Sequence, residues 1–229
     1  VTRAMPAAKK IPRPLPKPVR AEPPVAQSAA IEAVAISSLD APSVDGIGLL
    51  PVARTGLPRD LWGKTPAGVL AQALRAVPRD ALPAMQQLRM ELLLAEVNPP
   101  IALDPANRNA LFLARIDTLL DLGALEPAFT MLGEAPLTDP EIFRRYFDVA
   151  LLLGQEDRAC AALEATKGLT PALPTRIFCL ARGDDWDAAT LTLSSARALG
   201  TIDDETEQLL AQFLDPALAD EEGPVTPPA

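Results

Sequence analysis

Three stretches of the chain decide the fold: residues 119–132 read LLDLGALEPAFTML, residues 150–163 read ALLLGQEDRACAAL, and residues 178–193 read FCLARGDDWDAATLTL. Aligned on their glycines, which stand 31 and 29 residues apart, each has a leucine three positions earlier and an alanine five positions later. These residues are Leu120, Gly123 and Ala128, then Leu151, Gly154 and Ala159, then Leu180, Gly183 and Ala188. A helix that ends on glycine, a short turn and a second helix with a small residue near its start predict a closely packed helical hairpin.

Composition supports the same fold class. Hydrophobic residues make up 48% of the 229 residues, whereas aromatic residues make up only 4%. A core built mainly from alanine and leucine suits helices better than sheets. We therefore expect an all-α protein, a short αα-hairpin solenoid of eight or nine helices.

Prolines, glycines and charges predict four segments. Residues 1–36 form a basic, proline-rich, disordered arm, residues 37–64 an irregular loop anchored by Trp62, residues 65–214 the helical repeat domain, and residues 215–229 a disordered acidic tail. Helix starts are expected at Thr65 with Pro66, at Asp80, at Asp104 and at Asp139.

The arm and the remaining chain differ in charge. Residues 1–20 contain six of the 21 basic residues and no acidic residue, so the rest of the chain holds 15 basic and 30 acidic residues. Clustered acidic charge argues against nucleic-acid binding by the folded part. The arm is interpreted as a spacer in the first place, with a proline-motif ligand or an electrostatic tether to an anionic surface as the alternative.

The tripeptide Gly63-Lys64-Thr65 matches the end of a phosphate-binding loop. Pro58 stands where that motif needs its earlier glycine, and Pro66 follows directly. Capping of the next helix by Thr65 is therefore the favoured interpretation.

The three stretches resemble tetratricopeptide-type repeats, whose turn commonly reads glycine, two or three polar or aromatic residues, and alanine at the fifth position. The resemblance covers about residues 106–199, and Gly183 to Ala188 matches best. The period of 29 to 31 residues departs from the family's 34. More loosely, the chain is similar to bacterial helical repeat proteins of unknown role, often exported, in which a proline-rich segment and a loop like Asp60 to Thr65 precede the helices.

The chain contains no histidine, which removes the usual catalytic triads and histidine metal sites. Two acidic clusters, Asp184, Asp185 and Asp187 and then Asp203, Asp204 and Glu205, fall where helices should begin, so capping is favoured over catalysis or cation binding. No metal or cofactor is expected. Cys160 and Cys179 are expected on neighbouring helices, as two buried thiols in preference to a disulfide, which remains the alternative for an exported protein.

Arginines recur before the repeat glycines. Arg115, Arg145 and Arg176 precede them by eight, nine and seven positions, and Arg108 and Arg144 extend the row. On the inner face of a repeat array they would form a positive groove for an acidic peptide or a chain terminus, with an ordinary solvated face as the alternative.

We therefore expect a non-catalytic protein-protein interaction module or assembly adaptor. The alternative is an enzyme accessory or a carboxylate- or metal-dependent hydrolase-like function at the acidic clusters. The expected location is the periplasm or a membrane surface, reached through the arm or through a signal or anchor upstream of Val1, and the alternative is the cytoplasm.

Overall fold

The computed structural model describes residues 43–78, 81–101, 107–166, 169, 172–223 and 225. All of them belong to one unit, Ser38–Ala229. The expected basic arm, residues 1–36, lies outside the described residues.

The described residues form helices joined by turns and loops, and they form no strand longer than an isolated bridge, so the all-α prediction is confirmed. The described residues between 65 and 214 form nine helices. The elements in chain order are the 3-10 helix η1 (Val44–Gly46), α1 (Val52–Thr55), α2 (Ala67–Arg75), α3 (Pro83–Leu94), α4 (Ala110–Asp121), α5 (Leu125–Gly133), α6 (Pro140–Leu152), α7 (Glu156–Ala165), α8 (Leu173–Arg182), α9 (Trp186–Ala198), α10 (Asp204–Leu214) and α11 (Ala217–Glu222).

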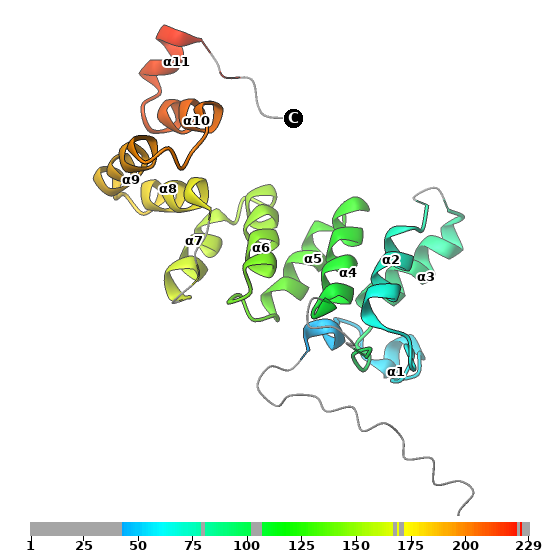
Figure 1. The fold of residues 1–229 in the computed structure, drawn as a ribbon. Helices are drawn as coiled ribbons and strands as arrows, with labels where there is room; N and C mark the ends of the chain where they lie inside the picture. Colours follow the sequence, from blue (N-terminus) through cyan, green and yellow to red (C-terminus); the bar gives the residue numbers. More distant parts are fainter. Residues whose placement is uncertain are drawn as a thin grey trace, which may run out of the picture. The chain divides into compact units, whose positions relative to one another are not determined.

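Helices that follow one another in the chain pack against one another. From α3 to α11 each helix contacts the next, and α2 contacts α4 and α8 contacts α10 across one intervening helix. Figure 1 shows α4 to α10 succeeding one another in this order. Helix α4 is enclosed on several sides, and seven of its twelve residues are buried because α2, α3, α5 and η1 all contact it. Phe112, Ile116 and Leu119 of this helix are fully buried.

Helix starts agree with the sequence at one position and differ at others. The Asp139 side chain accepts hydrogen bonds from the backbone N–H groups of Glu141 and Ile142 and caps α6, as expected. The cap assigned to Thr65 is wrong, because Pro66 precedes α2 and no side chain caps that helix. Asp80 and Asp104 lie outside the described residues, and the helices that follow them begin only at Pro83 and Ala110.

The three hairpins α4/α5, α6/α7 and α8/α9 share one turn geometry. In each hairpin the second residue after the first helix has a left-handed backbone. The residue that follows it donates its N–H to the carbonyl five positions earlier in the chain. These bonds run from Ala124 to Leu119 (2.8 Å), from Gln155 to Ala150 (2.8 Å) and from Asp185 to Leu180 (3.0 Å). They are the 6→1 bonds of a Schellman motif, which satisfy helix-end carbonyls.

The third turn corrects the expected register. Gly123 and Gly154 are left-handed with φ of 71° and 65°, but Gly183 has φ of −85°, and the left-handed residue is Asp184 with φ of 62°. The repeat therefore aligns on Asp184. Five positions after each left-handed residue stand Ala128, Ala159 and Ala189, all fully buried, whereas the expected Ala188 is half-buried.

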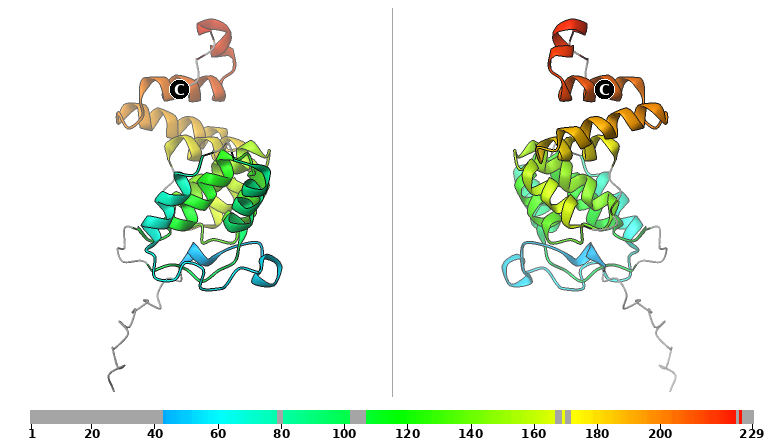
Figure 2. Two further views of the ribbon diagram at one scale, coloured as in Figure 1. Left: turned by 90° about the vertical axis from the view of Figure 1, so that its right-hand side faces the viewer. Right: turned by 90° about the vertical axis from the view of Figure 1, so that its left-hand side faces the viewer.

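The loop before α2 is fastened by backbone bonds. The N–H groups of Leu49 and Leu50 both donate to the carbonyl of Leu94 (2.8 and 2.9 Å), and Glu96 N–H donates to the carbonyl of Leu50 (2.8 Å). Gly48 permits this approach, because a Cβ there would lie 2.3 Å from the Ala95 carbonyl oxygen. Figure 2 shows this segment in blue at the ends of the green helices.

Trp62, the expected anchor of this loop, is half-buried and lies outside the two hydrophobic clusters. Its indole Nε1 is buried without a hydrogen-bond partner. At the other end of the chain, the segment expected to be a disordered tail begins with the short helix α11.

Candidate functional site

The five arginines of the row lie in different environments. The expectation that Arg115 lines an exposed groove is wrong. Its side chain is fully buried. Its guanidinium donates to the backbone carbonyls of Leu93 (2.7 Å), Ala95 (2.8 Å), Ile47 (2.6 Å) and Asp45 (3.3 Å). Arg115 therefore binds the end of the 3-10 helix η1 and the residue after it, Ile47, together with the end of α3, and is not available to a partner.

Asp45 completes this buried arrangement. Its carboxylate accepts a hydrogen bond from Phe112 N–H at 2.7 Å, in the first turn of α4, where N–H groups lack helical partners. Burial raises the pKa of Asp45, although this bond, one from Ser43 and the charge of Arg115 lower it. Burial likewise lowers the pKa of Arg115 to about 10, with Asp45 acting against that shift.

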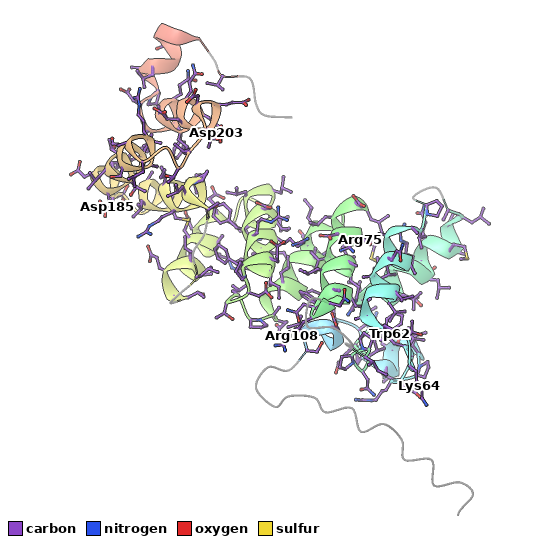
Figure 3. The ribbon with its side chains drawn as sticks, viewed as in Figure 1. Trp62, Lys64, Arg75, Arg108, Asp185 and Asp203 are labelled. Atoms are coloured by element: carbon purple, nitrogen blue, oxygen red, sulfur yellow. A yellow bond between two sulfur atoms is a disulfide. The ribbon has the colours of Figure 1, made fainter. Side chains whose placement is uncertain are left out.

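Arg145 belongs to a chain of ion pairs across α2, α4 and α6. Its Nε lies 2.6 Å from Asp117 on α4 and its Nη1 lies 2.9 Å from Glu141 on α6. Arg75 on α2 also reaches Asp117, at 3.2 Å, and Figure 3 shows Arg75 between α2 and α4. Burial disfavours the charge of Arg145, but its hydrogen bonds to Asp117 and Glu141 outweigh burial and raise its pKa. This arginine is neutralised within the protein.

Arg144 lies on the rim of a pocket between α6 and α8. Its side chain is 63% exposed and its ion pair with Glu141 is long, at 3.5 Å. The pocket has a volume of about 160 Å³, with Phe143 and Phe147 among its lining residues. Asp148 also lines it, and burial raises the pKa of that carboxyl despite Arg144 and Arg145.

Arg176 and Arg108 are both exposed. Arg108 stands just before α4 (Figure 3). Arg176 lines a second pocket, of about 270 Å³, between α7 and α8, whose other described lining residues are Leu163, Glu164, Leu169, Cys179 and Leu180. The five arginines of the row therefore do not form one continuous groove.

The turn register relates Arg176 to Arg115. Counted back from the left-handed residues Gly123 and Asp184, both arginines stand at the eighth position, and Tyr146 stands there in α6. Arg115 faces the end of α3, and Arg176 shares its pocket with Leu163 and Glu164 from the end of α7. In the first hairpin the end of η1 packs against this arginine and accepts its hydrogen bonds, whereas in the third hairpin a pocket lies beside the arginine.

The two cysteines are bonded in the structure. Cys160 on α7 and Cys179 on α8 form a disulfide with a Cα–Cα distance of 5.2 Å. The preference for two free thiols is therefore corrected. The bond joins successive hairpins at the wall of the Arg176 pocket.

The acidic clusters cap helices where their bonds are described. Asp185 accepts from Ala188 N–H at the start of α9, and Asp203 accepts from Thr206 N–H at the start of α10. The bond from the Thr206 backbone lowers the pKa of Asp203. Among the described residues, no three histidine, cysteine, aspartate or glutamate side chains are grouped so as to hold a metal ion.

The Gly63-Lys64-Thr65 tripeptide lies in a turn. Gly63 is left-handed with φ of 50°, and Lys64 is exposed beside Trp62 (Figure 3). The N–H of Gly63 donates to the carbonyl of Asp60, and the N–H of Thr65 donates to the carbonyl of Trp62, so both groups are bonded within the turn. This geometry does not form a phosphate-binding cradle.

No protein-family model matches the sequence, and neither a curated protein nor a solved structure matches the chain. No helix in the described part of the chain has the length and hydropathy needed to cross a bilayer. The class of protein therefore follows from the fold and the site: the described residues form an all-α protein in which an exposed arginine borders each of two pockets, one between α6 and α8 and one between α7 and α8.

Proposed function

We propose that the protein is a non-catalytic protein-protein interaction module, an assembly adaptor built as a short tetratricopeptide-like solenoid. Support comes from three hairpins with the same Schellman turn and from helices that contact mainly their chain neighbours. Arrays of this kind present extended surfaces to partner segments.

The pocket between α7 and α8 is the proposed partner site, and the relationship of Arg176 to Arg115 is the observation that carries it. Arg115 binds the end of η1 through the backbone carbonyls of Asp45 and Ile47. Arg176 has the same position in its hairpin, is exposed, and borders a pocket with Leu163 and Leu180. A planar guanidinium suits two acceptor oxygens, whether two carbonyls or one carboxylate. The proposed ligand is an extended segment or chain terminus with an apolar side chain for the pocket and a carbonyl or carboxylate for Arg176.

The proposed location is an oxidising compartment such as the periplasm. The Cys160–Cys179 disulfide supports it, because disulfides persist in secreted and periplasmic proteins and are rare in the cytosol.

The site is tested by selecting peptides from a random heptapeptide library on the immobilised full chain and measuring their affinity by titration calorimetry. Arg176→Ala should weaken the selected peptides about tenfold, as expected for loss of a charge-assisted hydrogen bond, and Arg176→Lys should recover only part of the affinity. Arg54→Ala, at an exposed position in α1, is the matched control and should leave affinity unchanged. Equal affinity of Arg176→Ala and wild type, or failure to enrich any peptide, would exclude this site.

A further inference from the structure

A chain of aromatic rings runs from the core to the surface. Phe147 on α6 contacts Phe178 on α8 with ring centroids 5.9 Å apart, Phe178 stacks on Phe213 of α10 at 5.6 Å, and Phe213 contacts Trp186 of α9 at 6.4 Å. Phe147 is buried, but Phe213 is 37% exposed and Trp186 46% exposed. The two outer rings form an aromatic surface that is held in place from beneath by Phe178.

The part of the chain that carries this aromatic surface has a strongly one-sided charge. Residues 183–229 hold eleven acidic residues and a single basic one, Arg197, which pairs with Glu207 at 3.1 Å. Asp185 and Asp187 flank Trp186 in the sequence, and Asp215 follows Phe213 by two positions. Apart from Arg197, the arginines discussed above all lie before residue 183. A partner of this surface meets two exposed rings in a negative field.

We propose that Trp186 and Phe213 form the docking surface for a basic segment of a protein partner, with its arginine or lysine side chains over the two rings. A cation is attracted to the face of tryptophan more than to other rings. The surrounding carboxylates add long-range attraction, which accelerates the encounter and opposes acidic partners. The same surface of a second copy of this chain is also negative and would be repelled by it.

This surface goes beyond the proposed Arg176 site, because it lies on α9 and α10 and selects the opposite charge. Two surfaces of different chemistry would allow the protein to hold two partners at once. The two proposals fail independently, since Arg176 is not part of the aromatic surface and Trp186 does not line the Arg176 pocket.

The probe is the peptide acetyl-(Ala-Arg)5-amide, titrated into the full chain at low salt. The protein has two tryptophans, so Trp62→Phe leaves Trp186 as the only indole, and its emission should change saturably with peptide. Acetyl-(Ala-Gln)5-amide and acetyl-(Ala-Glu)5-amide should not bind. Calorimetry with Trp186→Ala should show an affinity about tenfold lower, a size between those expected for a fully exposed and a desolvated cation–π contact.

Leu191→Ala is the matched control, because Leu191 is a large exposed side chain on the same helix, at 68% exposure. It should leave binding unchanged, and circular dichroism should show that all variants retain their helices. The proposal is overturned if Trp186→Ala binds the arginine peptide as wild type does, or if the glutamine peptide binds equally well. It is also overturned if sedimentation equilibrium shows a dimer that Trp186→Ala abolishes.

Discussion

Asp45 and Arg115 stand 70 positions apart, and their hydrogen bonds join the segments that carry them. Arg115 donates to the Asp45 backbone carbonyl, and the Asp45 carboxylate accepts from Phe112 N–H in α4, the helix that carries Arg115. The loop before α2, the end of α3 and the first turn of α4 meet there. The Arg115 guanidinium supplies the hydrogen-bond donors that backbone N–H groups of a helix or sheet would otherwise supply to these carbonyls.

Arg115→Ala should be among the most destabilising single substitutions. It leaves several buried carbonyls without a donor, at about 1–3 kcal/mol for each unsatisfied group, so we expect a loss of at least about 3 kcal/mol in the free energy of unfolding. Urea denaturation measures it. Arg144→Ala, at an exposed position, should change stability by no more than about 0.5 kcal/mol. A loss below about 1 kcal/mol for Arg115→Ala would contradict the buried role.

Asp45 should make stability depend on pH with a defined sign. Its folded pKa is raised by burial above the ordinary 3.8, so the folded state holds this proton over a pH range in which the unfolded state has released it. Stability contributed by the protonated form is present below pH 3.8 and is lost as pH rises through the folded pKa.

Asp45→Asn removes this titration and keeps an oxygen that can accept from Phe112 N–H. Compared with wild type, the variant should therefore gain relative stability as pH rises above about 4. Denaturant titrations of both proteins at matched pH values measure the difference. A difference that is constant with pH, or that grows in favour of wild type, would contradict the raised pKa.

Removal of the Cys160–Cys179 disulfide should lower stability. The bond closes a loop across 19 positions, for which the chain-entropy model gives about 3 kcal/mol. Reductant should lower the midpoint of wild-type unfolding, whereas a Cys160→Ala, Cys179→Ala double variant should resemble reduced wild type and not respond. Thiol titration of protein unfolded without reductant should find no free thiol, and two thiols per chain would refute the bond.

The hairpins could be predicted from the sequence because glycine at a helix end and a buried alanine after it are local requirements. The environment of each arginine could not, because it depends on contacts between distant segments. One position along a helix is about 100° of rotation, which separates buried Arg115 from ion-paired Arg145 at nearly the same distance from their glycines. Nothing local marks Asp45 as the partner of α4, and Asp117 and Asp148 likewise acquire their roles only through helix packing.

The left-handed positions should respond differently to substitution. Gly154→Ala places a Cβ in open space but at φ of 65°, so backbone strain alone should cost about 1 kcal/mol. Gly183→Ala, at φ of −85° with its Cβ 3.4 Å from the Cys179 carbonyl oxygen, should be neutral or stabilising. Asp184→Gly should stabilise by about 0.5 kcal/mol because it relieves a left-handed aspartate. If Gly183→Ala lowers the free energy of unfolding as much as Gly154→Ala does, the third repeat aligns on Gly183, as the glycines in the sequence predict, and not on Asp184.

The alanines test the same register through packing. Ala189 is fully buried and lies in a small hydrophobic cluster with Ile177, Ala181 and Leu210, whereas Ala188 is half-buried. Ala189→Leu inserts three carbons into this cluster and should cost about 1–3 kcal/mol through overpacking. Ala188→Leu has room toward solvent and should cost less than Ala189→Leu by at least about 1 kcal/mol. Thermal and urea unfolding of the two variants give the comparison. A larger loss of stability for Ala188→Leu would mean that Ala188, and not Ala189, faces α8 and α10, as the alignment on the glycines predicts.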